Sequence, residues 1–208
     1  METTAELTGF LTATAVLGRI VPGALEYEVA IACVAAMQRE VAAAFSGASM
    51  KGCDVLFQSG IHTDGARNPV TDKRIESGDV LSLTCAPVLF GYTSLMQRTL
   101  FCDHADDASL AIWEKNLTVH RRALDLIRPG VLCRDIAREL SDLDRQCDLL
   151  KYRSGGYGQT MGLQSKSFGG DQDVTLREDC FAELRPGMVI SVDPTLIVPE
   201  GTAGAGGY

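Results

Sequence analysis

An internal repeat is the feature that most constrains the fold of this 208-residue chain. The turn Ile20–Gly23 recurs as Ile127–Gly130 at an offset of 107 residues, and an apolar helical pattern follows each copy. The run Gly78–Thr84 recurs as Gly187–Asp193 at an offset of 109 residues. Two elements repeated in the same order at nearly the same offset indicate a duplicated unit. We therefore expect two similar halves, with matching strands side by side about a pseudo-twofold axis and a pocket between them.

Hydrophobic spacing predicts helices in pairs and strands in hairpin-like groups. Apolar residues recur every three or four positions in three segments, which predicts helices over about 25–45, Asp106–Ile127 and Ile136–Leu150. Short β-branched runs predict strands over Val80–Thr84, Pro87–Tyr92, Arg98–Phe101 and Met188–Asp193. This arrangement predicts an α+β fold rather than a doubly wound sheet.

The composition describes one globular domain over residues 1–208 and excludes several partners. With 46% apolar residues and a net charge of −8, the chain can bury a core, and its acidic balance disfavours nucleic acid. The apolar runs are shorter than the roughly 20 residues that a bilayer demands, and the N-terminus lacks the basic residues of a signal peptide. Seven cysteines without a CxxC pair favour a reduced, cytoplasmic protein.

The repeat also indicates that the second half is incomplete. In the first half, Phe90–Tyr92 follows the repeated strand and a returning strand reaches Phe101. In the second half, Gly206–Tyr208 falls where Phe90–Tyr92 would, and no returning strand follows. Such a sheet has an unpaired edge, which invites association. We expect a truncated chain, or a partner that supplies the missing strands.

Four long stretches resemble the superfamily of creatinase, prolidase and methionine aminopeptidase, and within it the creatinase branch. They are Phe57–Leu83, Leu89–Asn116, Leu149–Gly162 and Glu183–Pro194, and the resemblance covers about residues 26–208. It implies the pita-bread fold, without the smaller N-terminal domain of that family and without its last strands.

The resemblance also bears on metal binding. Aminopeptidase members hold two metal ions with two Asp, one His and two Glu. Here the two Asp positions are Thr84 and Leu95, the His position is Gln159, and the first Glu position is Asp193. One carboxylate cannot hold a dinuclear centre. The creatinase branch works without metal, so the resemblance implies no metal and no cofactor.

The activity implied by the resemblance is hydrolysis of creatine to sarcosine and urea by a homodimer. The catalytic His of that branch matches Gln159, and a second familial His, before Asn-Pro, is replaced by Arg67. Tyr157 and Asp193 match substrate-binding positions. An amide can orient a water but cannot take its proton, and acid–base catalysis is typically worth about 10²–10⁴-fold. We therefore expect an inactive or much weakened hydrolase.

Three histidines remain to be placed. His62 lies in a segment that borders the expected pocket and is the one candidate for a surrogate base. His120 lies on the apolar stripe of the second helix, where a hydrogen-bonded core or interface residue is expected. His104 belongs to a solvated loop before that helix.

Two other functions stay open. Catalytically silent pita-bread domains occur in the superfamily as protein-interaction units, and an open sheet edge with a degenerate pocket suits that role. A metallo-aminopeptidase or prolidase is the least favoured reading, because Thr84 and Leu95 stand at the positions of metal-binding carboxylates. Tight, stoichiometric Mn, Co or Zn binding would favour it.

Overall fold

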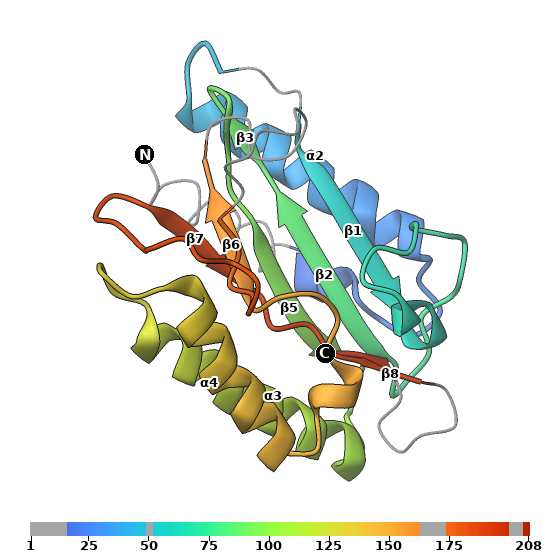
Figure 1. Cartoon of the computed structure of the whole chain (residues 1–208). Coiled ribbons are helices and arrows are strands. Elements are labelled where there is room, and N and C mark those ends of the chain that lie inside the picture. The colour runs from blue at the N-terminus through green and yellow to red at the C-terminus, as the bar shows by residue number, and fades with distance from the viewer. Residues whose placement is uncertain (1–15, 49–51, 163–173, 200–205) are drawn as a thin grey trace.

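A computed structural model of the chain shows an α+β fold with its long helices on the outer side of antiparallel sheets (Figure 1). The structure describes residues 16–48, 52–162, 174–199 and 206–208. The order of the elements is η1 (Leu17–Arg19), α2 (Glu26–Ala44), β1 (Asp54–Ser59), η2 (Gly60–Asp64), β2 (Val80–Ala86), β3 (Val88–Leu89), β4 (Tyr92–Thr93), β5 (Met96–Phe101), α3 (Asp107–Leu126), α4 (Cys133–Gln146), η3 (Leu150–Tyr152), β6 (Gly158–Met161), β7 (Val189–Val192), β8 (Ile197–Val198) and β9 (Gly206–Gly207). No helix among these residues is both long enough and apolar enough to cross a bilayer.

The first half is a three-stranded sheet covered by one helix. Its strand order is β1-β2-β5, antiparallel throughout, and α2 packs against β1. The buried stripe of α2 meets the outer face of the sheet in one apolar cluster, which includes Val29, Cys33, Met37, Phe57 and Leu83. This cluster covers the face of the sheet that is turned toward α2. The opposite, inner face is not covered by α2 and can line a site.

The second half pairs β6 with β7 and covers them with α3 and α4. Asp106 caps α3, because its carboxylate accepts a hydrogen bond from the main-chain N–H of Ser109 at 2.7 Å. Ile136 and Leu140 of α4 pack with Val119 of α3 and with the half-buried Ile190 and Val192 of β7. The halves are tied together by hydrogen bonds between distant segments, among them Gly207 N to Thr63 Oγ1 at 2.7 Å.

The backbone confirms the repeat at the predicted offsets. Leu25 forms an antiparallel bridge with Arg74, and Leu132 forms the same bridge with Glu183, 107 and 109 residues further on. Gly23 and Gly130 both take a left-handed conformation, with φ of 91° and 87°. The main-chain N–H of Gly23 donates to the carbonyl of Ile75, and that of Gly130 donates to the carbonyl of Leu184, both at 2.8 Å. The turn therefore requires glycine in both halves, because other residues rarely adopt this φ.

A short hairpin also occurs in both halves, and it corrects the sequence alignment. Val88 pairs with Thr93, and Ile197 pairs with Gly207 in the same way. Gly206 and Gly207 thus take the places of Tyr92 and Thr93, two residues later than the alignment with Phe90–Tyr92 suggests. The first half continues into β5, whereas β7 has no described strand on its second edge.

Several predicted elements differ from the structure. The run Pro87–Tyr92 is no single strand, because Phe90 and Gly91, with φ of 51° and 87°, turn the chain back on itself between β3 and β4. The third helix ends at Gln146 rather than Leu150, since Asp148 takes a positive φ and stops it. β1 and β6 were not predicted.

Candidate functional site

A cavity of about 880 Å³ lies against the inner faces of both sheets. Alternate residues of a strand point to the same face, so the side chains that reach the cavity recur at every second position. On β2 these are Thr84 and Ala86, and on and beside β5 they are Leu95 and Gln97. The second half contributes Gln159 from β6 and Asp193 from the end of β7. The cavity is therefore built by both copies of the repeat, as the pseudo-twofold predicts.

Five positions singled out from the sequence line this one cavity. They are Arg67, Thr84, Leu95, Gln159 and Asp193. Gln159 and Ser191 are cross-strand partners in the β6–β7 ladder, which fixes the position of Gln159 at the sheet centre. Asp193 follows β7 directly, and its main-chain N–H donates to the carbonyl of Tyr157 at 3.2 Å.

Tyr157 does not line the cavity, which corrects its expected role in substrate binding. The side chain is buried, and its hydroxyl donates to Asp144 Oδ2 at 2.7 Å and lies 3.2 Å from Ser141 Oγ. Burial raises the pKa of Tyr157 to about 12, and the neighbouring Asp144 carboxylate acts in the same direction. Tyr157 therefore belongs to the core beneath α4, in one apolar cluster with Ile136 and Leu140.

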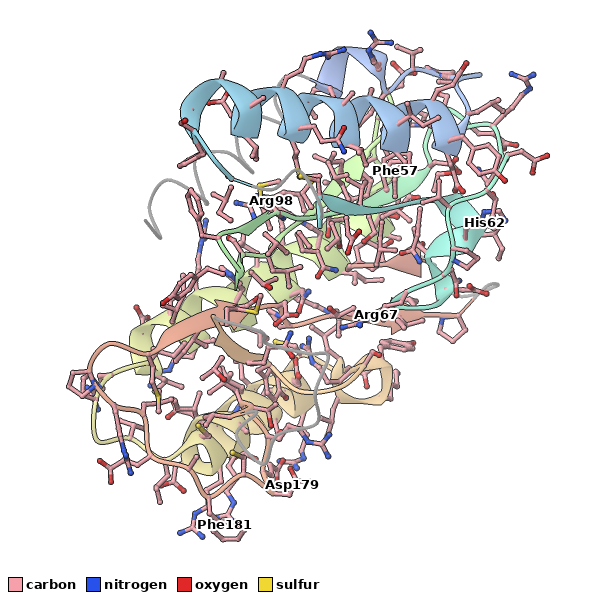
Figure 2. The ribbon with its side chains drawn as sticks, turned by 90° about the horizontal axis from the view of Figure 1, so that it is seen from above. Phe57, His62, Arg67, Arg98, Asp179 and Phe181 are labelled. Carbon is pink, nitrogen blue, oxygen red and sulfur yellow. The ribbon has the colours of Figure 1, made fainter. Side chains whose placement is uncertain are left out.

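His62 lies outside the cavity as well, so the structure does not place a surrogate base there. Figure 2 shows it at the outer end of the molecule, within η2. Its Nδ1 is 3.3 and 3.4 Å from the two carboxylate oxygens of Glu26 and 3.1 Å from Thr71 Oγ1. The imidazole ring therefore contacts a buried carboxylate, and it does not line the cavity that Arg67 lines.

Glu26 is the buried centre of that contact. Its carboxylate is fully buried and accepts hydrogen bonds from the main chain and hydroxyl of Ser59, both at 2.8 Å, and of Thr71, at 3.0 and 2.8 Å. Burial by itself raises the pKa of Glu26, but these hydrogen bonds outweigh it and hold the pKa below its ordinary value. This network is structural, because it joins the start of α2 to the end of β1.

His120 lines a second groove of about 760 Å³, which adjoins the cavity at Leu95, Gln97, Asp193 and Thr195. The groove runs between β5 and β7, and residues of α3, including Trp113 and Leu117, form its remaining wall. His120 is half-buried, and burial together with nearby Arg98 lowers its pKa, although a hydrogen bond to the main chain of Val192 opposes this. His104 is exposed beside Asp103, in the loop before α3.

Gln97 and Arg177 are among the cavity residues that were missed from the sequence. Gln97 could have been found by alternation, since it lies two positions after Leu95. Arg177 lies in no recognisable motif. It lines the cavity from a segment that is hydrogen-bonded to β6 through Leu176. Its guanidinium already pairs with Asp179 at 2.9 Å.

The described residues do not fit a metal centre. No group of three or more His, Cys, Asp or Glu side chains gathers among residues 16–48, 52–162, 174–199 and 206–208. The acidic residues that line the cavity are Asp54 and Asp193, and neutral Thr84, Leu95 and Gln159 lie between the two sheets. A centre with two divalent metal ions requires several anionic or imidazole ligands, and these side chains do not supply them.

Comparison with known proteins agrees with this architecture. The whole chain, residues 1–208, matches metallopeptidase family M24, and the chain belongs to that family. Within it, the chain is 46% identical over 194 residues to a creatinase of Bacillus sp. (strain B-0618), covering 93% of this chain and 47% of the creatinase. It is 27% identical over 176 residues to a Xaa-Pro dipeptidase of Pyrococcus furiosus, covering 78% of this chain and 47% of the dipeptidase. The chain spans about half the length of these relatives.

Solved structures confirm the pita-bread fold. The prolidase from Pyrococcus furiosus superposes with a TM-score of 0.86 at 22% identity, covering all of this chain and 57% of the prolidase. The Xaa-Pro dipeptidase from Bacillus anthracis gives a TM-score of 0.85 at 23% identity, covering 100% and 54%. At this identity the likeness concerns the fold, and it supports the predicted α+β class and duplicated architecture.

Proposed function

We propose that this chain is a creatinase-type domain that keeps a cavity for a small guanidino acid such as creatine but hydrolyses it weakly or not at all. The 46% identity to a creatinase supports the substrate class, since that relative is named for creatine hydrolysis. One observation carries the proposed loss of turnover: both positions at which the resemblance implies a histidine line the cavity, and they are Gln159 and Arg67.

Hydrolysis of a guanidinium carbon requires a group that takes a proton from water and returns one to the leaving nitrogen. None of the residues that the structure places around the cavity is a histidine. Gln159 is not basic, and a guanidinium such as that of Arg67 stays protonated in proteins. Asp193 remains as a carboxylate that can hold the substrate guanidinium, but a carboxylate is a far weaker base than an imidazole.

The test combines binding with turnover. Calorimetric titration with creatine should give saturable heat, while urea release by the same protein should stay at the level of the no-protein blank. Gln159→His alone should not restore the full rate of an active creatinase, because Arg67 still occupies the second position. Urea release by the unaltered protein at a rate comparable to that creatinase would contradict the proposal.

A second function is favoured by the groove between β5 and β7. We infer that this groove can accept an extended polypeptide strand, because β2 pairs with β5 on its second edge whereas the repeated strand β7 has no described partner there. Unpaired strand edges bind peptides by main-chain hydrogen bonds. Arg98 and half-buried His120 line this groove beside β7.

A labelled peptide with the sequence of β5, Met96–Phe101, is a suitable probe, since β5 is the strand that pairs with β2, the counterpart of β7. Binding measured by fluorescence anisotropy should exceed that of a scrambled peptide of the same composition. Equal binding of the two peptides would remove the support for this second function.

A metallo-aminopeptidase activity is not supported. The side chains around the cavity do not form a metal-binding set, for the reasons given above. Isothermal titration with Mn²⁺, Co²⁺ or Zn²⁺ should show no tight stoichiometric site.

A further inference from the structure

The loop 65–69 presents Arg67 to the cavity and is held on both sides of that residue. Gln58 Nε2 donates to the carbonyl of Gly65 at 2.9 Å and to the carbonyl of Asn68 at 3.2 Å. Asn68 Nδ2 in turn donates to the carbonyl of His62 at 3.0 Å and to Asp64 Oδ1 at 2.6 Å. These four hydrogen bonds hold the backbone before and after Arg67, so the side chain starts from a fixed point of the loop.

Gln58 is placed to act as a clamp by the pleat of β1. Asp54, Leu56 and Gln58 alternate along the strand, and the first two line the cavity. Gln58 therefore points to the same inner face, where it is 2% exposed. A buried side-chain amide is costly unless its N–H groups are hydrogen-bonded. Both of the hydrogen bonds that its Nε2 donates go to the loop that carries Arg67.

Arg67 brings a positive charge to the cavity. Within the described part of the chain it forms no ion pair, whereas the other cavity arginine, Arg177, pairs with Asp179. The side chain is exposed, and Figure 2 shows it in the space between the two halves. A guanidinium that forms no ion pair among the described residues is a binding group for an anion, and its planar fork matches a carboxylate.

We propose that Arg67 is the carboxylate-binding residue of this cavity, and that the cavity takes a small zwitterion whose carboxylate lies on Arg67 and whose cationic end lies toward Asp193. Arg67 and Asp193 come from opposite halves of the repeat and line the same space. This inference rests on the ligand class of the proposed function but not on the loss of turnover. Gln58 acts as a positioning residue, because it touches the loop rather than the ligand.

The experiment is calorimetric titration with three probes: creatine, sarcosine, which keeps the carboxylate but lacks the guanidinium, and methylguanidinium chloride, which lacks the carboxylate. Arg67→Gln should weaken creatine and sarcosine binding at least tenfold and leave methylguanidinium binding within about twofold. Arg67→Lys, which keeps the charge but loses the fork, should give an intermediate affinity. Arg122→Gln is the matched control, since Arg122 is an exposed arginine that pairs with Glu139 on the outer helices.

Several outcomes would overturn the inference. Creatine affinity of Arg67→Gln equal to that of the unaltered protein, or no heat with creatine and sarcosine at millimolar concentration, would contradict it. An equal loss of methylguanidinium binding would show that the variant damages the cavity as a whole. Urea release measured in the same samples reports separately on the proposed function. If the unaltered protein hydrolyses creatine and its affinity still depends on Arg67, the proposed loss of the catalytic base is wrong and the proposed carboxylate site stands.

Gln58→Leu provides a second variant that does not remove the charge. If the clamp positions Arg67, creatine affinity should fall while methylguanidinium affinity holds, and the loop amides of residues 65–68 should exchange with solvent faster. A loss of stability with no change in the ratio of the two affinities would show that Gln58 is merely structural.

Discussion

The two halves of the molecule share a backbone but stabilise their buried carboxylates by different chemistry. In the first half, Glu26 is bound by neutral donors from Ser59 and Thr71, with His62 beside it. In the second half, Asp144, also fully buried, accepts two hydrogen bonds from the guanidinium of Arg153 at 2.8 and 2.6 Å. Turns and register recur in both halves, whereas the two buried carboxylates lie at different places, because Glu26 begins α2 and Asp144 lies near the end of α4.

The first way to sharpen this comparison is to remove Asp144, where the largest effect is expected. Asp144→Ala leaves the guanidinium of Arg153, 5% exposed, without its counter-ion and takes away a partner of the Tyr157 hydroxyl. Loss of one member of a buried ion pair typically costs about 3–5 kcal/mol. Urea denaturation should show a loss of that size in the free energy of unfolding.

Asp142→Ala on the same helix is the matched control. Asp142 pairs with Arg145 one turn away, and both side chains are more than half exposed. Exposed pairs of this kind contribute at most about 1 kcal/mol. Equal losses in the two variants would show that burial of the Asp144–Arg153 pair does not matter to stability.

A smaller effect with a distinct pH dependence is expected at Glu26. Its carboxyl has a lower pKa in the folded than in the unfolded chain, so it stabilises the fold at pH above about 4.5, and this contribution is lost as the pH falls through the folded pKa. Glu26→Gln keeps the shape but leaves the donors with a weaker acceptor, at a cost of about 1–3 kcal/mol at pH 7.

The measurement is the midpoint of urea unfolding between pH 7 and pH 3. The unaltered protein should lose stability below about pH 4.5, and Glu26→Gln should lose less over the same range, so that the two curves converge. Parallel curves would contradict the role given to this carboxylate. Asp144→Ala cannot serve in this test, because it also leaves the buried guanidinium of Arg153 without a counter-ion.

The sheet edges offer the third and mildest contrast. β2 has strand partners on both sides, whereas β7 is paired with β6 alone among the described strands. Strands with an open edge unfold locally at lower free energy, so their amides exchange faster. Hydrogen exchange followed by mass spectrometry should show faster exchange in Val189–Val192 than in Val80–Ala86. Slower or equal exchange in β7 would mean that its second edge is covered.

Much of the fold could be predicted from the sequence because the repeat lies in residues with strong local preferences. Pro22-Gly23 and Pro129-Gly130 fix the turns before two helices, and the β-branched runs after Gly78 and Gly187 fix the paired strands. β1 and β6 escaped prediction because their sequences, DVLFQS and GQTM, are not β-branched runs. The pattern of Pro87–Tyr92 reads as one strand, since the positive φ of Phe90 leaves no trace in residue type.

The site was predicted in part. Gln159, Asp193, Thr84, Leu95 and Arg67 meet in one cavity, as the family resemblance implies. Tyr157 was misplaced, because its burial and its hydrogen bond to Asp144 of α4 arise from tertiary packing, which the glycine-rich run around it does not reveal. The engagement of His62 by Glu26 could not be foreseen either, because it joins residues 36 positions apart through tertiary packing.

The most direct test of the central claim is the rate of sarcosine formation from creatine at pH 7.5, measured for this protein, for its Arg67→His/Gln159→His variant and for an active creatinase at equal concentration. The account predicts a rate at least about 100-fold below the active enzyme for the unaltered protein, the scale of one lost acid–base group. The double variant should exceed the unaltered protein. Sarcosine formation by the unaltered protein at a rate close to that of the active enzyme would contradict the claim that its cavity lacks a proton carrier.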